Sequence, residues 1–326
     1  MVALLAALPV DEQARALAPA SAGSRKLILS TNVAETSLTI DGVRAVVDPG
    51  YAKEKSFVRE RGMEVLATAR ISRSAAAQRA GRAGRTAPGE VWRLYSEAAF
   101  DAMAAEPTPE IARCNLAHAL LLLKSMGIAR PAALEWLDPP PPAALVGAAR
   151  QLYLLDAIDV SGALTADGRR MARLPLEPCL ARFCLAAARL RCVRAAAAVG
   201  AMACGEEPYV RAGPPEVREA AARTRARLCE RDGDHLGMKR ALDEWAAVPR
   251  AERAAWCREH GLHGRALATA DEVRRQLLAA LAAAGEGDGG DGGGGDGDDE
   301  SRRVRRALCE GYFMNAARRM RGAFIK

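Results

Sequence analysis

Three arginines and two glycines lie within the eight residues QRAGRAGR, which run from Gln78 to Arg85. In a helix of about 3.6 residues per turn, Gln78, Arg82 and Arg85 share one face. Arg79 then points away from that face. Guanidinium groups stay charged at physiological pH and donate paired hydrogen bonds to phosphate oxygens, so the shared face would suit a triphosphate. A basic helix that faces solvent or nucleic acid is the alternative, and this motif alone leaves both open.

A second polar motif, STNVAETSLTIDG, runs from Ser30 to Gly42. It gathers hydroxyls, an amide, a glutamate and an aspartate after a predicted strand, and open α/β sheets bind ligands at the carboxyl ends of their strands. The same groups could merely cap the next helix, for which Thr36 or Ser37 is suited. The two motifs in this order, roughly 40 to 55 residues apart, are hard to obtain by chance and favour a ligand site.

The elements that would position these motifs alternate between strand and helix. Arg25–Asn32, Val43–Gly50 and Gly89–Ser96 are apolar runs that end at turn residues and predict strands. Ser72–Gly84 predicts a helix that begins at a serine cap. This alternation predicts a parallel sheet of the α/β class.

Helical periodicity predominates from residue 116 onward. Residues 116–179 predict a winged helix, because two helical segments precede a hairpin expected within Asp159–Pro178. The proline run in Asp138–Pro142 can be neither helical nor a central strand, so it predicts a rigid connector. Residues 180–284 are almost wholly helical in pattern and predict a bundle.

An acidic, glycine-rich tract at residues 285–300 has no apolar side chain and predicts a disordered linker. Residues 301–326 begin a further basic element, and we expect the chain to end inside a domain. The predicted fold class is therefore a partial α/β lobe with a parallel sheet, followed by mainly α-helical winged-helix and bundle domains.

Composition bounds the class of protein. The chain has 326 residues, half of them hydrophobic, which allows two or more buried cores. Its formal net charge of +7 includes seven acidic residues of the tract at 285–300, so the remainder is more basic and favours a polyanionic partner. No apolar run approaches the roughly 20 residues of a membrane span and no signal peptide is visible, so we expect an intracellular protein without membrane contact. The eight cysteines include no CxxC pair, and neither they nor the four histidines predict a metal site.

The two polar motifs together resemble those of the DEAH-box RNA helicases, a group of superfamily 2. The resemblance extends along nearly the whole chain. The segments that follow the two motifs in this family are similar to VVDPGYAKEKSF and GEVWRLYSEAAF. The entry of the family's winged helix is similar to NLAHALLLLKSMGI with DPPPP, and its wing is similar to LTADGRRMARLPLEP. GDHLGMKRALDEW and WCREHGLHGRALATADEVRRQL resemble the family's ratchet domain, and RRALCEGYFMNAAR resembles the start of its oligonucleotide-binding fold.

This resemblance implies a domain for each part of the chain. Residues 1–115 would form the second RecA-like helicase lobe, incomplete at its N-terminus, and residues 116–179 the winged helix. Residues 180–284 would form the ratchet-like, helicase-associated bundle, followed by the linker at 285–300. Residues 301–326 would start an oligonucleotide-binding fold that is truncated.

Catalytic roles within QRAGRAGR also follow from the resemblance. It implies that Arg82 and Arg85 act as arginine fingers across a cleft, and that Gln78 helps to order the γ-phosphate and the attacking water. The implied cofactors are ATP and Mg²⁺. Since the sequence has no GxxxxGK[ST] loop, no DEAH tetrapeptide and no SAT motif, we expect a first RecA-like lobe to hold both.

The resemblance assigns the other motif to nucleotide and RNA. Ser37 and Thr39 would couple the nucleotide state to movement, and Asp41 would contact the ribose or its waters. Thr31 and Asn32 would grip the RNA backbone, which hydroxyl and amide donors can do without reading sequence.

We therefore expect the C-terminal part of an ATP-dependent RNA helicase, which couples ATP hydrolysis to remodelling of RNA or ribonucleoprotein. The chain alone is expected to be inactive, as a natural truncation or an incomplete gene product. A non-enzymatic RNA-binding or adaptor protein is the alternative class. The expected partners are single-stranded RNA of any sequence and an activating protein, and the family favours the nucleus over the cytoplasm.

Overall fold

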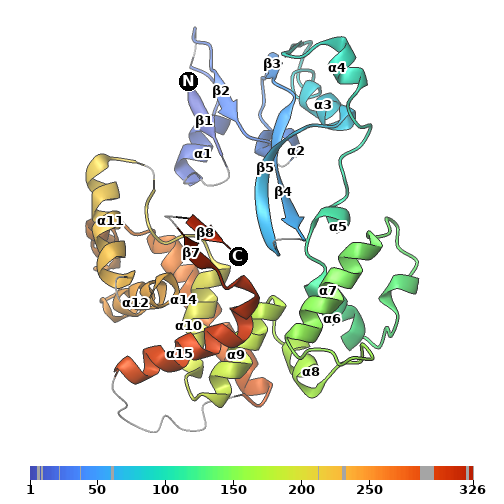
Figure 1. Ribbon diagram of the computed structural model, residues 1–326. Helices are drawn as coiled ribbons and strands as arrows, with labels where there is room; N and C mark the ends of the chain where they lie inside the picture. The colour runs from blue at the N-terminus through green and yellow to red at the C-terminus, as the bar shows by residue number, and fades with distance from the viewer. Residues whose placement is uncertain are drawn as a thin grey trace. The chain divides into compact units, whose positions relative to one another are not determined.

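The computed structural model describes all residues except 6, 7, 9, 22, 37, 60, 61, 212, 230–232, 287–296, 321, 322 and 326. The chain divides into two compact units (Figure 1). Unit 1 contains Met1–Asn115 and Trp136–Pro140, and unit 2 contains Leu116–Glu135 and Pro141–Lys326.

Unit 1 combines short strands with short helices. Its strands are β1 (Val2–Leu4), β2 (Ile28–Ser30), β3 (Ala45–Asp48), β4 (Tyr51–Val58), β5 (Met63–Arg70) and β6 (Glu90–Arg93). Its helices are α1 (Val10–Leu17), α2 (Val33–Thr36), α3 (Arg73–Ala80), α4 (Glu97–Asp101) and α5 (Glu110–Arg113).

Two pairs of parallel strands confirm the predicted α/β class. β1 pairs with β2, with Val2 opposite Ile28, and β3 pairs with β6, with Val47 opposite Trp92. The STNVAETSLTIDG motif begins at the last residue of β2 and continues into α2. It thus lies at the carboxyl end of a parallel strand, where ligand sites of such sheets are found.

An antiparallel hairpin, β4–β5, was not among the predicted elements. Its register runs from Tyr51 opposite Arg70 to Val58 opposite Met63. Burial alternates from residue to residue along much of β4, which is the periodicity of a strand with one covered face. The hairpin returns the chain to Ile71, whose amide donates to the carbonyl of Gly50 at 3.1 Å. The start of α3 is thereby placed beside the end of β3.

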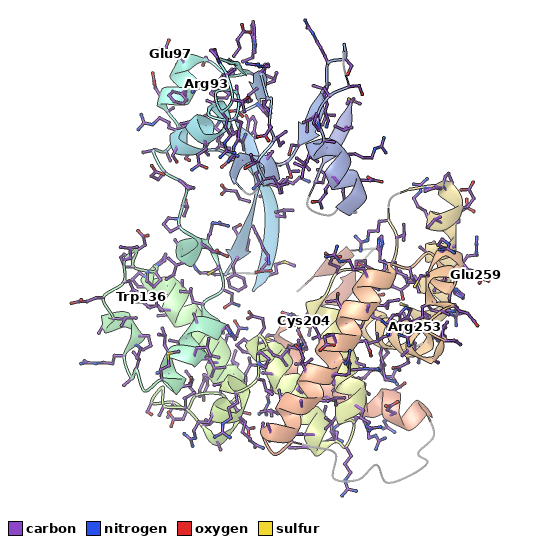
Figure 2. All side chains as sticks on the ribbon, turned by 180° about the vertical axis from the view of Figure 1, so that it is seen from behind. Arg93, Glu97, Trp136, Cys204, Arg253 and Glu259 are labelled. Carbon is purple, nitrogen blue, oxygen red and sulfur yellow. The ribbon has the colours of Figure 1, made fainter. Side chains whose placement is uncertain are left out.

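Helix α3 begins where the sequence predicted. Ser72 caps it, because its hydroxyl accepts a hydrogen bond from the amide of Ala75 at 3.1 Å. A small apolar core anchors the helix and comprises Ile71, Ala76 and Met103, with Ala52, Ala75, Tyr95 and Phe100 packed against them. The guanidinium of Arg93, labelled in Figure 2, covers this core by lying 4.4 Å from the centre of the Phe100 ring.

Unit 2 is almost wholly helical. Its helices are α6 (Ala117–Ser125), η1 (Pro131–Ala133), α7 (Pro142–Leu154), α8 (Ala166–Ala172), α9 (Pro178–Arg189), α10 (Val193–Cys204), α11 (Pro215–Cys229), α12 (Asp234–Ala247), α13 (Arg253–His260), α14 (Gly264–Ala283), α15 (Gly297–Tyr312) and η2 (Phe313–Asn315). Its strands are β7 (Arg318–Met320) and β8 (Ala323–Ile325), which pair in antiparallel fashion.

The hairpin predicted within Asp159–Pro178 is reduced to one antiparallel bridge around the Ser161–Gly162 turn. A single bridge joins Ile158 to Leu164, and the next residues form α8. The reason is local, because the Asp159 carboxylate accepts hydrogen bonds from the Ser161 and Ala163 amides at 2.8 and 3.1 Å and closes a tight turn. Thr165 then caps α8, since its hydroxyl accepts the amide of Gly168 at 2.9 Å.

Helices α9 and α10 form the centre of the bundle and are largely buried. Burial raises the pKa of the Cys184 thiol on α9 to about 12, which keeps this core thiol protonated. At the other side of the bundle, the Arg253 guanidinium (Figure 2) lies 4.1 Å from the centre of the Trp245 ring. Phe183 of α9 and Trp245 of α12 are both buried, so the bundle packs aromatic side chains together with small ones.

Helix α15 differs from the expectation for the C-terminal part of the chain. It begins at Gly297, so the last four residues of the tract predicted as a disordered linker are helical. It also packs along α9 (Figure 1), with Val304 and Ala307 fully buried. Gly311 makes the close approach feasible, because a Cβ there would lie 2.3 Å from the carbonyl oxygen of Cys179. The helix therefore packs against the bundle through Val304 and Ala307.

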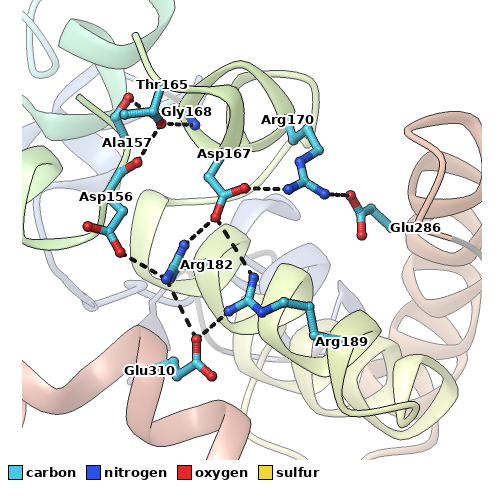
Figure 3. A network of polar contacts seen from close by, with 10 residues as sticks. All are labelled: Asp156, Ala157, Thr165, Asp167, Gly168, Arg170, Arg182, Arg189, Glu286 and Glu310. Carbon is cyan, nitrogen blue, oxygen red and sulfur yellow. Dashed lines mark hydrogen bonds and ion pairs between the residues drawn. The ribbon is translucent and has the colours of Figure 1, made fainter. Parts of the chain in front are cut away.

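A polar network ties α8 to the bundle (Figure 3). Arg182 of α9 donates to Asp167 of α8 at 2.6 Å and to Asp156 at 3.0 Å. Arg170 of α8 pairs with Asp167 and with Glu286, which is 8% exposed. Burial opposes ionisation of Asp167, but the hydrogen bonds and charges of the two arginines outweigh it and lower the pKa of this carboxyl.

The same network reaches the C-terminal helix. Arg189 of α9 pairs with Glu310 of α15, and Arg182 lies 3.7 Å from the same carboxylate. Charged groups from α8, α9 and α15 therefore neutralise one another at one junction, which fixes how these helices pack.

No helix of the described part combines the length and the apolar character that crossing a bilayer requires.

Candidate functional site

The two polar motifs meet in unit 1. Arg82 donates from Nη1 to the carbonyl of Leu38 at 3.1 Å and from Nη2 to the carbonyl of Glu35. Arg85 donates from Nη1 to Oγ1 of Thr39 at 2.8 Å. Segments more than 40 residues apart in the chain thus form one cluster, to which QRAGRAGR contributes two guanidinium groups.

The helix in which QRAGRAGR begins is shorter than predicted. It ends at Ala80, and the amides of Arg82 and Ala83 donate to carbonyls only three residues back, at 3.1 Å each. Two glycines in this stretch, Gly81 and Gly84, disfavour continued helix. The prediction that Gln78 and Arg85 share one helical face is therefore wrong, because Arg85 lies beyond the helix. Arg82 and Arg85 nevertheless reach the same motif from the turn that follows it.

Arg79 has a different environment, which the sequence did not reveal. Its Nε lies 2.9 Å from Oε2 of Glu35, and its Nη1 lies 2.8 Å from Oδ1 of Asp48 and 3.2 Å from the carbonyl of Tyr51. Burial alone would lower the pKa of Arg79, but its hydrogen bonds to the two carboxylates and their charges raise it. Arg79 is a structural anchor that holds α3 against α2 and β3.

Asp48 is the centre of this anchor and is 1% exposed. Its Oδ1 accepts the amide of Gly50 at 3.0 Å as well as Arg79, and its Oδ2 accepts the hydroxyl of Tyr95 at 2.9 Å. Burial, and then the hydrogen bond to Asp48, raises the pKa of Tyr95. The sequence signal that could have identified Asp48 as a buried, paired residue is its place in an apolar strand just before Pro49 and Gly50.

Arginines hold α2 from two sides. Arg79 pairs with the side chain of Glu35, while Arg82 donates to the main-chain carbonyl of the same residue. Any movement of α2 must therefore change the contacts of the QRAGRAGR segment. This gives a direct physical link between the two motifs.

The remaining predicted residues are exposed around this cluster. Thr31 and Asn32 lie between β2 and α2, where their carbonyls accept the amides of Ala34 and Glu35 at 3.3 and 2.9 Å. Asp41 lies in the turn before β3, and Gln78 lies in the last turn of α3. Ser37 lies outside the described residues. The structure thus brings Arg82, Arg85 and Thr39 together. It leaves the side chains of the other predicted site residues that it describes, Thr31, Asn32, Asp41 and Gln78, exposed and accessible to a ligand.

Phosphate oxygens fit the donors of this cluster. A guanidinium carries five N–H donors, so the hydrogen bonds of Arg82 and Arg85 leave donors unused. Among the described residues, neither arginine has a carboxylate within ion-pair distance. The described part also holds no group of three or more His, Cys, Asp or Glu side chains that could bind a metal ion. The arrangement can therefore neutralise an anion.

Family comparisons agree with this geometry. Residues 1–87 match the helicase conserved C-terminal domain, and residues 148–176 match the winged helix of the helicase associated domain, HA2. The chain is 38% identical over 314 residues, 96% of its length, to the pre-mRNA-splicing factor ATP-dependent RNA helicase prp22 of Schizosaccharomyces pombe. Its fold resembles that of the E. coli DExH-box NTPase HrpB, with a TM-score of 0.70 and 30% identity over 98% of the chain.

The chain spans 26% of the length of prp22 and 33% of the HrpB chain. Both matched domains occur in the order that the two sequence motifs and the winged-helix pattern predicted. The chain therefore belongs to the DEAH-box helicases of superfamily 2 and corresponds to their C-terminal portion.

Proposed function

We propose that this chain acts as part of an ATP-dependent RNA helicase that remodels RNA or ribonucleoprotein. The observation that carries the proposal is the convergence of Arg82 and Arg85 on the segment that contains Thr39. In this proposal ATP and Mg²⁺ are held mainly by a first RecA-like lobe, and unit 1 supplies groups across the cleft. A nuclear role in RNA processing belongs to the same proposal, since the relative prp22 is a pre-mRNA-splicing factor.

The proposed chemistry is electrostatic. Arg82 and Arg85 exchange their present contacts for phosphate oxygens when the cleft closes, and stabilise the charge on the transferring phosphoryl group. Gln78 orders the attacking water, and Asp41 contacts the ribose. These roles need side chains that remain accessible, as Gln78, Arg85 and Asp41 are.

Coupling to RNA follows from the same contacts. Release of Thr39 by Arg85 frees the segment that begins with Thr31 and Asn32, the proposed grip on the RNA backbone. Arg82 acts on the same segment through the carbonyls of Glu35 and Leu38. We assign Ser37 to this coupling as well, on the resemblance of the motif alone.

We expect the purified chain to hydrolyse no ATP, because it has the proposed fingers without a phosphate-binding loop. Phosphate release measured with and without RNA checks this. The Arg82→Ala variant is the control for contaminating enzymes. RNA-stimulated turnover that disappears in this variant would show that the chain is active by itself.

We also expect the purified chain to bind single-stranded RNA weakly and with little sequence preference. Phosphate contacts should dominate, so the logarithm of the association constant should fall with the logarithm of salt concentration, by about 0.7 for each phosphate neutralised. Fluorescence anisotropy with oligouridylate and a mixed sequence measures both properties. Binding that is independent of salt, or no binding at low salt, would contradict this expectation.

A further inference from the structure

The winged-helix part of unit 2 contains a cavity that the proposed ATPase chemistry does not use. It has a volume of about 680 Å³ and lies between the end of α6, the turn before α8, and α8 itself. Figure 1 shows α6 and α8 in the same part of the unit, and the two helices are in contact. Ligand pockets have volumes of roughly 300 to 1,000 Å³. The cavity is thus large enough for a small organic ligand or one unit of a polymer.

Among the described residues, three cations and no carboxylate line this cavity. Lys124 at the end of α6 donates from Nζ to the carbonyl of Ala129 at 3.2 Å. Arg169 of α8 donates from Nη1 to the carbonyl of Leu164 at 2.8 Å. Arg173, one helical turn further, is exposed at the C-cap of α8. Two cations are therefore held in place by main-chain oxygens, and each keeps further donors for a ligand.

Asp159 precedes the lining residues of the turn, and its carboxylate is hydrogen-bonded within that turn. Asp159 accepts the hydroxyl of Ser161 at 2.6 Å and two main-chain amides. The hydrogen bond from the Ser161 hydroxyl contributes most to lowering the pKa of Asp159, and the bonds from the main-chain amides lower it further. Asp159 therefore stays ionised, but its side chain does not line the cavity, and its single negative charge faces three cations that do.

Apolar groups provide the rest of the lining. Ile128, Leu164 and Ala172 contribute alkyl surface, and Ser125 and Ser161 contribute hydroxyls. A Cβ at Gly162 would lie 3.7 Å from Nζ of Lys124, so the glycine turn and the lysine are neighbours. The lining therefore offers cations for phosphate oxygens and alkyl surface for a sugar or a base.

We propose that this cavity binds a nucleoside phosphate. Guanidinium groups match phosphate oxygens in pairs and also stack on bases, so Arg169 and Arg173 can contact both parts of such a ligand. The proposal rests on the proposed RNA function for its preferred source, which is a nucleotide within an RNA strand. A free mononucleotide has the same chemistry. The cavity is a second contact for RNA, separate from Thr31 and Asn32.

The test compares charge reversal inside and outside the cavity. Arg173→Glu changes an exposed cation of the lining, and Arg150→Glu changes an exposed cation on α7 that does not line it. Fluorescence anisotropy with a labelled oligouridylate should show a roughly tenfold lower association constant for Arg173→Glu at low salt. The slope of the logarithm of this constant against the logarithm of salt concentration should decrease by the contribution of about one phosphate contact. Arg150→Glu should change the constant by less than about twofold. Arg169→Ala should weaken binding in the same direction as Arg173→Glu.

Labelled AMP distinguishes the two sources. Binding of AMP that Arg173→Glu abolishes shows that the cavity accepts free nucleotide, and RNA binding without AMP binding assigns it to the strand. If the wild type binds RNA and both glutamate variants bind equally well, the cavity is not a subsite, while the proposed function stands. If the wild type binds no RNA, the proposed function fails, and the binding of labelled AMP alone then shows whether the cavity accepts a nucleoside phosphate. Binding of polyglutamate with neither RNA nor AMP would overturn the inference in favour of an acidic peptide.

Discussion

Arg82→Ala or Arg85→Ala should lower ATP turnover by about 10³- to 10⁵-fold in a helicase that joins this chain to a first RecA-like lobe. ATP affinity should fall much less. Charge builds up on the transferring phosphoryl group only near the transition state, so a guanidinium from across the closed cleft lowers the barrier more than it stabilises bound ATP. Steady-state phosphate release gives the turnover, and titration with a non-hydrolysable ATP analogue gives the affinity.

Lysine at either position should restore little of the lost turnover, because it keeps the charge but lacks the planar pair of donors. Arg73→Ala is the matched control, since Arg73 is an exposed arginine in the first turn of the same helix, α3. It should change turnover by less than about twofold. Wild-type turnover in folded Arg82→Ala and Arg85→Ala variants would show that neither arginine is a finger.

Arg79 cannot serve as such a control, although helical spacing alone suggests it. It forms ion pairs with Glu35 and Asp48, and 14% of its side chain is exposed. Arg79→Ala would leave Asp48 buried without its cation. A loss of turnover in this variant would report a change in the fold of unit 1, and says nothing about contact with phosphate.

The parts of the site that depend on neighbouring residues could be predicted from the sequence. β3 lies within the predicted strand Val43–Gly50, and Ser72 caps α3 as its position before a run of helix formers indicated. A ligand site that involves both motifs was expected from their type and order. It is supported by the hydrogen bonds that Arg82 and Arg85 donate to the other motif.

The parts that depend on distant residues could not be predicted. Asp48 meets Arg79 and Tyr95, which are 31 and 47 residues further along the chain, so no local pattern marks it as buried and paired. The end of α3 at Ala80 depends on the turn that lets Arg82 reach the carbonyls of α2. Helix periodicity extended that helix to Gly84 because periodicity carries no information about such contacts.

Asp48→Ala should lower the free energy of unfolding of unit 1 by about 3–5 kcal/mol, the usual cost of removing one partner of a buried ion pair. Three groups donate hydrogen bonds to this carboxylate. The substitution leaves the Tyr95 hydroxyl and the Gly50 amide without their acceptor, and it leaves Arg79 with Glu35 as its remaining carboxylate. Hydrogen exchange of peptides from β3 and α3, measured by mass spectrometry across urea concentrations, follows this part of the chain alone.

The control and the double variant show whether pairing is the cause. Asp101→Ala removes an exposed carboxylate at the end of α4 and should change the free energy of unfolding by less than about 0.5 kcal/mol. Asp48→Ala combined with Arg79→Ala should cost clearly less than the two single changes together, because each single change leaves a buried charge that the second removes. Strictly additive losses would mean that the two residues stabilise unit 1 independently, and that Arg79 does not hold α3 through Asp48.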